Sequence, residues 1–502
     1  MKPIIVALSL ALPLSAATTL NSEEPESYNP AAPPKVEEGP TKEALTLFNQ
    51  GRHEAAVILA RPLAEKGDVD ALFLLGFAAE TGQGMEASRE SALESYRLAA
   101  AKGHQEATYR RALILLNSSD EKERQQGNSA LEDASKTDPK TAGRILGEAW
   151  LRGLLSEKPD PEKAALWWRR ASDAGDNSSL LLLARLFSGE FGFPEITDAE
   201  KGLDLYRKAA GLGEKAAYLP LGSRLLNGDE KSRNEEQGRA WLEKAIKEDL
   251  TAAYLALGDY EEIVKKNDKA AYAFYLKGAE AEQPDCMLRL ASFLFNGRGT
   301  EKSEDKAREW LEKAVKAGSA VAAYELAGIY SKAEKPEMLK VYSYVLMAAT
   351  GGIPNAQNEL GLLYLAGNLG AADAPAAVAW FTRAAQAGNA AAQNNLATLY
   401  EGGIGVPVNY NNAGELYVLA ANQGHPAATT ALARMYAVGI GTEADLVKAW
   451  AFASLAIDRG DKDATTILGE ISKKITPEQL AEAKKELEKL KSPSAPDKAE
   501  DK

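Results

Sequence analysis

The sequence predicts an all-α fold: a right-handed α-solenoid, or α/α superhelix, of about twelve stacked helix hairpins. Three observations lead to this prediction. A central Leu recurs from Leu75 to Leu468 at intervals of 33 to 38 residues. Alanine accounts for 89 of the 502 residues, and it favours closely packed helices. A Gly follows most of the second helices, where a left-handed backbone costs Gly least.

The central Leu can be followed through the whole chain. It falls at Leu75, Arg111, Leu146, Leu183, Leu221, Leu257, Leu290, Leu326, Leu360, Leu396, Leu432 and Leu468. Arg111 interrupts the series, so the hairpin over residues 106–140 is a degenerate copy. The Gly that ends each second helix recurs as well, at Gly103, Gly175, Gly213, Gly318, Gly352, Gly388, Gly424 and Gly460.

One repeat shows why the copies must stack. Ala392, Leu396, Leu399 and Tyr400 fall at helical spacing on one face of a first helix, and a second helix follows around Tyr417. A hairpin of about 36 residues cannot bury both of its apolar faces alone, so neighbouring copies must cover them.

The two ends of the chain differ from the repeats. Residues 1–17 have one Lys, an apolar run and small closing residues, so they predict a secretory signal peptide; an apolar N-terminal helix of the fold is the alternative. Residues 18–40 are rich in Pro and Glu and predict a linker, residues 41–490 form the solenoid, and residues 491–502 form a disordered polar tail. We therefore expect an exported protein, periplasmic or extracellular, with no transmembrane segment after signal cleavage.

The last part of the solenoid carries its own signal. Thr476, followed by Pro477 and then Gln479, forms a capping box with Pro at the first helical position. The charged helix that follows is suited to shield the open end of a solenoid from solvent.

Composition excludes several classes of function. One Cys rules out a disulfide framework, a Cys-rich zinc site and an iron–sulfur cluster, and three His leave little material for a metal centre. The net charge of −13 argues against nucleic acid as a partner. Pairs such as Gly439 and Gly441 are expected to be interhelical turns, because a phosphate loop needs a strand before it. We predict no enzyme, no cofactor, and no catalytic or metal-binding residue.

The repeats resemble the Sel-1-like repeat family, a relative of the tetratricopeptide repeats. Leu360, Gly361, Tyr364 and Gly367 match the first half of the family pattern. The second half is matched by Lys306, Ala307, Trp310, Ala314 and Gly318. The units that begin at Ala252 and Ala322 depart from the pattern, because they lack its Gly-rich loop. The resemblance implies protein–protein interaction, in a secreted bacterial member of the family.

The leading hypothesis is a secreted or periplasmic scaffold or adaptor that binds a protein or an extended peptide along a concave groove. Related repeats line that groove with their first helices, so the candidate contacts are Gln357, Asn358, Gln393, Asn394 and Asn395. A structural role for these residues is the alternative. Binding of peptidoglycan or exopolysaccharide is the second hypothesis. A β-lactamase-like enzyme is the third, although the chain lacks the Cys pairs of the family members associated with that activity.

Overall fold

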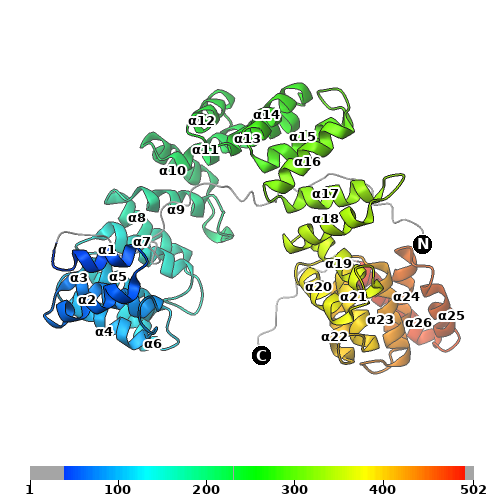
Figure 1. The fold of residues 1–502 in the computed structure, drawn as a ribbon. Coiled ribbons are helices and arrows are strands. Elements are labelled where there is room, and N and C mark those ends of the chain that lie inside the picture. Colours follow the sequence, from blue (N-terminus) through cyan, green and yellow to red (C-terminus); the bar gives the residue numbers. More distant parts are fainter. Residues whose placement is uncertain (1–38, 230, 492–502) are drawn as a thin grey trace. The chain divides into compact units, whose positions relative to one another are not determined.

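A computed structural model of the chain describes residues 39–229 and 231–491. Within these residues every regular element is helical, and the chain divides into two compact units at Asn267 and Asp268 (Figure 1). This confirms the predicted all-α solenoid class. The predicted signal peptide, most of the linker and most of the tail lie outside the described residues. None of the helices described is both long enough and apolar enough to cross a membrane.

The first unit contains helices α1 to α13 and three short helical turns. Their bounds are α1 Lys42–Asn49, α2 His53–Glu65, α3 Val69–Thr81, α4 Arg89–Ala100, α5 Gln105–Leu116, α6 Glu121–Ala134, α7 Pro139–Leu151, α8 Pro161–Asp173, α9 Asn177–Phe187, η1 Pro194–Ile196, α10 Ala199–Gly211, η2 Lys215–Ala217, α11 Tyr218–Asn227, α12 Glu235–Lys247, α13 Ala252–Asp259 and η3 Tyr260–Val264.

The second unit contains helices α14 to α26. Their bounds are α14 Asp268–Glu280, α15 Pro284–Asn296, α16 Glu304–Lys316, α17 Ala320–Ser331, α18 Met338–Thr350, α19 Pro354–Ala366, α20 Ala374–Gln386, α21 Ala390–Gly402, α22 Tyr410–Asn422, α23 Pro426–Val438, α24 Leu446–Asp458, α25 Ala464–Ser472 and α26 Pro477–Lys491. Odd-numbered helices from α3 onward are the first helices of the repeats, and even-numbered helices are the second helices.

Most second helices bury a bulky anchor side chain against the first helix of their own repeat, whereas α24 has Ala453 at that position. Trp168 and Phe381 are fully buried anchors of this kind. Gly147 and Gly361 lie opposite them on the first helices. A Cβ added at Gly361 would lie 2.7 Å from the Phe381 ring. Gly is therefore required after the central Leu in these two repeats, because a side chain at that position would clash with the ring of the anchor residue.

The turn after most second helices has a left-handed residue seven positions beyond the anchor; α6 is an exception, because Asp138 in the turn that follows it has φ of −126°. The eight Gly residues predicted there all have φ between 83° and 92°. In two repeats without that Gly, Asp249 and Glu282 occupy the same position with φ of 62° and 59°. These two repeats therefore keep this backbone conformation although their residue does not favour it.

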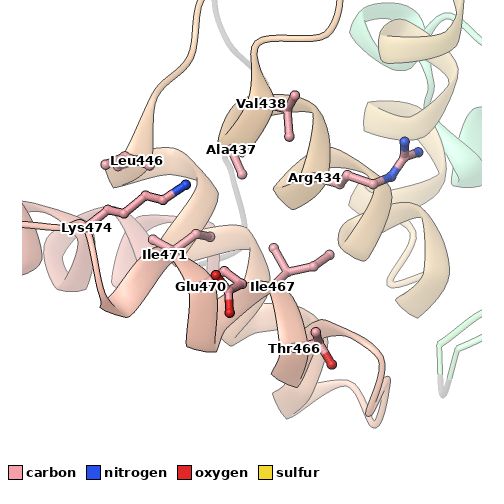
Figure 2. Close-up of a pocket in the computed structure, with 9 residues that line it drawn as sticks. All are labelled: Arg434, Ala437, Val438, Leu446, Thr466, Ile467, Glu470, Ile471 and Lys474. Atoms are coloured by element: carbon pink, nitrogen blue, oxygen red, sulfur yellow. The ribbon is translucent and has the colours of Figure 1, made fainter.

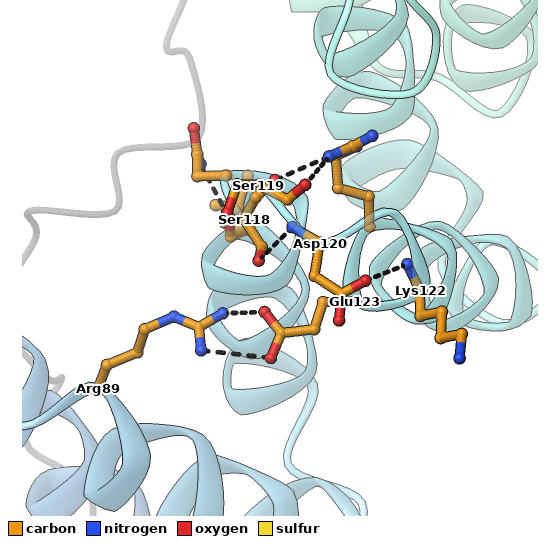
Figure 3. A network of polar contacts seen from close by, with 9 residues as sticks. Arg89, Ser118, Ser119, Asp120, Lys122 and Glu123 are labelled. Carbon is orange, nitrogen blue, oxygen red and sulfur yellow. Dashed lines mark hydrogen bonds and ion pairs between the residues drawn. The ribbon is translucent and has the colours of Figure 1, made fainter.

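The degenerate hairpin α5–α6 replaces a Gly-rich turn with side-chain hydrogen bonds (Figure 3). The Ser118 hydroxyl accepts from the Asp120 backbone N–H at 3.1 Å, and the Arg124 guanidinium donates to the Ser118 and Ser119 carbonyls at 3.0 and 2.9 Å. Arg89 of α4 pairs with Glu123 of α6 and links this hairpin to the one before it. The copy that the sequence marks as degenerate thus keeps the helical architecture by other contacts.

Two of the three His residues cap first helices. The Nδ1 atoms of His104 and His425 accept from the backbone N–H groups of Ala107 and Ala428, at 3.1 and 3.3 Å. The predicted capping box at the start of α26 is also present, because Thr476 and Gln479 exchange side-chain and backbone hydrogen bonds. These residues therefore have local structural roles.

Candidate interaction surface

The two positions immediately before the central Leu form a polar strip along the first helices of the second unit. The strip consists of Tyr324 and Glu325 on α17, Asn358 and Glu359 on α19, Asn394 and Asn395 on α21, and Thr430 on α23, all of them half-buried. Residues i−1 and i−2 of a helix lie away from the face that residue i buries. The strip therefore borders the core formed by the central Leu residues without belonging to it.

Hydrogen bonds connect the strip from one repeat to the next. The Tyr324 hydroxyl donates to Glu359 Oε1 at 2.8 Å, which links α17 to α19. The Asn395 Nδ2 atom donates to Asn358 Oδ1 at 2.9 Å, which links α19 to α21. Hydrogen bonds therefore connect the strip over three neighbouring repeats, those of α17, α19 and α21.

The strip is partly shielded from water, and this affects its carboxyl groups. Burial raises the pKa of Glu325, and the more distant charge of Lys332 offsets this only in part. Burial also raises the pKa of Glu359 in spite of the Tyr324 hydrogen bond. The pKa of Tyr324 is raised by burial and by the neighbouring Glu359. Groups that are partly desolvated before binding lose less hydration when a partner covers them.

Two repeats of the first unit have apolar residues at the positions that form the strip in the second unit. Phe73 and Leu74 of α3, and Leu181 and Leu182 of α9, occupy the equivalent positions and are buried apolar residues. These first helices use the same positions for packing. Candidate polar contacts are therefore concentrated in the second unit.

The five candidate contacts separate into two groups. Gln357 and Gln393 are buried, with 8% and 4% of their surface exposed, and their Nε2 atoms donate to the Ala349 and Ala385 carbonyls at 3.2 Å. These two side chains join a first helix to the preceding second helix, so a ligand on the surface does not reach them. Asn358, Asn394 and Asn395 belong to the polar strip, and their contact with a ligand stays a prediction.

A cluster of Glu, Tyr and Arg at the edge of the strip was not predicted from the sequence. Glu401 at the end of α21 accepts from the Tyr417 hydroxyl at 3.0 Å and from Arg434 of the next first helix at 2.7 Å. Burial alone would raise the pKa of Glu401, but the hydrogen bond and charge of Arg434 and the Tyr417 hydroxyl lower it below its usual value. The same arrangement occurs at Glu80, Tyr96 and Arg110, and at Glu190, Tyr206 and Arg224.

Four half-buried Trp residues of the second helices each carry a cation over the ring. The pairs are Trp167 with Arg170, Trp241 with Lys244, Trp310 with Lys313 and Trp380 with Arg383, at 3.8 to 4.8 Å from the ring centroid. Stacking on a sugar requires an open aromatic face. These rings are therefore poorly disposed to form a row of glycan contacts.

The chemistry of the described region is that of a binding surface. Cys286 is fully buried in α15, in the slot that Ala fills in neighbouring repeats. Across residues 39–229 and 231–491, no group of three or more His, Cys, Asp or Glu side chains is placed to hold a metal ion. What the first helices offer instead is a set of hydrogen-bonding groups distributed over several repeats.

Two curated relatives share about half of this chain. Chitin synthase regulatory factor 3 of Schizosaccharomyces pombe is 31% identical over 260 residues, which are 50% of this chain and 28% of that protein. The chitin synthase regulator SKT5 of Saccharomyces cerevisiae is 26% identical over 269 residues, 51% of this chain and 38% of that protein. The chain thus spans roughly a third of the length of either relative.

Among solved structures, a protective antigen of uropathogenic Escherichia coli with an SLR fold is similar to this chain. It is 26% identical, covers 86% of this chain and 94% of its own, and superposes with a TM-score of 0.48.

Family models match most of the repeats individually. The model of plant tetratricopeptide repeats matches residues 64–144. The Sel1 repeat model matches eight segments, residues 145–176, 178–214, 216–250, 251–282, 284–319, 354–389, 390–425 and 426–461. It passes over α17 and α18, one of the units that departs from the pattern in sequence, although both helices are formed. Because the eight segments cover more than half of the 502 residues, the chain belongs to the Sel1 repeat family.

Proposed function

We propose that this protein is an exported interaction scaffold that binds an extended segment of a partner protein along the polar strip of its second unit. Sel1 repeat proteins generally mediate protein–protein interaction, and repeat scaffolds of this kind are typically non-enzymatic. The observation that carries the proposal is the run of half-buried side chains that hydrogen bonds connect from α17 through α19 to α21.

The pair of Asn residues at the centre of the strip suits a peptide backbone. Asn395 Nδ2 donates to Asn358 Oδ1, so the pair uses one donor and one acceptor internally. The Asn358 Nδ2 and Asn395 Oδ1 atoms have no hydrogen-bond partner among the described residues. A free donor beside a free acceptor matches the C=O and N–H groups of one peptide unit. A segment without secondary structure of its own offers such groups at regular intervals.

The names of the two fungal relatives are compatible with this proposal. Both are described as regulators of chitin synthase, and regulation of another protein through binding is the role that we transfer to this chain. The target of the regulation is not transferred with it. With a net charge of −13, a partner steered by long-range charge would be neutral or basic on most of its contact surface.

Photo-crosslinking in the native host tests the proposal. A photoreactive amino acid replaces Asn394 on the strip, and the control carries it at Leu419, which is 51% exposed on the second helix α22. We expect a discrete protein adduct from Asn394 alone, and less of it when Asn358→Ala and Asn395→Ala are added. Equal labelling from Asn394 and Leu419 would contradict the proposal.

Export is a separate part of the proposal and has its own test. The apolar run and small closing residues within positions 1–17 support it. We expect fractionation of host cells to recover the protein outside the cytosol, with an N-terminus near Thr18, and removal of residues 2–17 to retain it in the cytosol. A cytosolic protein that keeps residues 1–17 would refute export and leave the binding proposal standing.

A further inference from the structure

A cavity of about 200 Å³ lies between the first helices α23 and α25, with the start of α24 beside it (Figure 2). Ala437 and Val438 of α23 face Ile467 and Ile471 of α25 across it, and Leu446 of α24 closes one side. Thr466 and Ile467 occupy the two positions before the central Leu468, which are the positions that form the polar strip in earlier repeats. The cavity therefore continues the same set of first-helix positions, with apolar side chains in place of amides.

The size of the cavity limits what can fill it. Pockets for drug-sized ligands and cofactors usually measure about 300–1,000 Å³, which is more than this cavity provides. An apolar cavity of about 150 Å³ is already large enough for a benzene ring. A volume of about 200 Å³ therefore suits a single apolar side chain of the size of Phe or Leu. Val438 is 68% exposed, so the cavity has an apolar entrance.

The charged groups around the cavity do not balance. Arg434 is engaged by Glu401, with Nη1 to Oε1 at 2.6 Å, and Glu470 is engaged by Lys473 at 2.5 Å. Lys474 also lines the cavity and has no ion pair in the part of the chain that the structure describes. Lys474 therefore adds a positive charge at the rim that acts on Glu470 without forming an ion pair with it, in a protein whose net charge is −13.

We propose that this cavity receives one apolar side chain, of the size of Phe or Leu, from an extended segment of a partner protein, and that an Asp or Glu next to it in that segment pairs with Lys474. The inference rests on the proposed function and adds specificity to it. The polar strip would hold the backbone of the segment, and the cavity would set its register by selecting one apolar-acidic dipeptide. We assign the occupant to a partner segment because two adjacent residues of such a segment meet both requirements of the site. One residue fills the cavity with its apolar side chain, and its acidic neighbour forms an ion pair with Lys474.

Methyl NMR on the full-length protein tests the inference with defined peptides. The probe is the capped hexapeptide Gly-Ser-Phe-Asp-Ser-Gly, and the matched peptides replace Phe with Ala or Asp with Lys. We expect the probe to shift the methyl resonances of Val438 and Ile467. The dissociation constant should rise at least tenfold for the Ala peptide and at least fivefold for the Lys peptide.

Three variants locate the binding. Ala437→Leu fills the cavity and should abolish the shifts, and an unchanged thermal unfolding midpoint would show that the fold is intact. Lys474→Glu should weaken the Asp peptide at least fivefold and strengthen the Lys peptide. Lys485→Glu makes the same change of charge on the exposed surface of α26, outside the cavity, and should leave both affinities unchanged.

Several outcomes would overturn the inference. Equal binding of all three peptides, or binding that survives Ala437→Leu, would show that the cavity does not select a side chain. Shifts of the cavity methyls when residues 492–502 are removed would assign the cavity to this chain's own end, and concentration-dependent dimerisation lost in Ala437→Leu would assign it to a second copy. A partner crosslinked at Asn394 together with no peptide binding would refute the cavity alone, whereas peptide binding without a crosslinked partner would refute the proposed function.

Discussion

Glu282 occupies a backbone conformation that disfavours it, and its replacement by Gly should stabilise the second unit. It lies seven residues after the anchor Tyr275 with φ of 59°, where most repeats have Gly. Its N–H donates to Ala279 at 3.1 Å, and the next N–H, of Gln283, donates to Gly278 at 3.0 Å. Gly388 and Asn389 make the same two bonds, to Ala385 and Ala384, at 3.0 Å. The two turns are therefore equivalent except for the side chain.

The magnitude follows from two opposing effects. A left-handed conformation costs an ordinary L-residue about 1–2 kcal/mol, which Glu282→Gly removes. Gly also makes the unfolded chain more flexible, which costs about 0.4–1 kcal/mol. The difference is a gain of about 0.8 kcal/mol. Packing does not enter the comparison, since a Cβ added at Gly388 would meet no atom within 4 Å.

Hydrogen exchange measured by mass spectrometry gives the most direct test, since long repeat arrays need not unfold in one step. In Glu282→Gly, we expect the amides of α14 and α15 to exchange roughly fourfold more slowly, which corresponds to about 0.8 kcal/mol. The matched variant Gly388→Ala should speed exchange in α20 and α21 by a similar factor. Asp249→Gly should have a smaller effect than Glu282→Gly, because Asp tolerates the left-handed region better. Faster exchange in Glu282→Gly, or no effect of Gly388→Ala, would refute the reasoning.

Three further predictions concern side chains between repeats. Gln357 Oε1 is buried without a partner, whereas the equivalent Gln393 Oε1 accepts from Gln423 at 2.8 Å. Ala387 is the counterpart of Gln423 one repeat earlier, so Ala387→Gln should supply the missing donor and raise the free energy of unfolding by about 1 kcal/mol. The control Ala387→Leu has no donor and should not have this effect. Burial lowers the pKa of His425, against the opposing charge of Asp461, and the Nδ1 that caps α23 accepts only when neutral. The cap is therefore fully present above the unfolded-state pKa and is lost as the pH falls through the lower folded-state pKa. Urea titrations should show that the free energy of unfolding falls by about 1 kcal/mol more in wild type than in His425→Asn between pH 7 and pH 5. The Asn side chain serves as the control because it keeps an acceptor at every pH. Glu401→Gln should destabilise α21 to α23 by about 1 kcal/mol, since Arg434 is half-exposed and screened; unchanged exchange in these helices would show that the cluster contributes nothing.

The sequence was sufficient to predict the fold because the repeat makes the same demands in every copy. The interval between successive Leu residues located the first helices, and the closing Gly located the end of the second helices. The structure adds the reason for the exceptions. Asp249 and Glu282 adopt the left-handed turn without Gly, because the packing of flanking helices outweighs a local cost of about 1–2 kcal/mol.

Helix geometry separates the candidate contacts into buried and half-buried residues. Gln393 is three residues before Leu396, and Ala392 is four residues before it, so all three share the buried face. Asn394 and Asn395 are two residues and one residue before Leu396 and point elsewhere. The spacing therefore places Gln393 on the buried face, in agreement with the structural role that the sequence leaves open as the alternative.

The Glu and Tyr pairs were also available from the sequence. Glu80 and Tyr96, Glu190 and Tyr206, and Glu401 and Tyr417 are each separated by 16 residues. A search restricted to apolar positions misses this spacing. The cavity at α23 and α25 could not have been found in this way, because its volume depends on how several side chains fill the space between two helices.

The positions that the repeat leaves free are the ones that can acquire a function. The central Leu, the anchor and the closing Gly are required for packing, so variation at those sites is limited to residues that the backbone tolerates, such as Glu282. The two positions before the central Leu vary more between repeats. In α3 they are Phe73 and Leu74, which pack in the core, in α21 they are the half-buried Asn394 and Asn395, and in α25 they are Thr466 and Ile467 beside the cavity. Where these side chains are only half-buried, as in α21, a change at these positions alters the surface and leaves the central Leu, the anchor and the closing Gly in place. Specificity for a partner can therefore differ from one copy to the next while the architecture stays the same, which is the property that a binding scaffold requires.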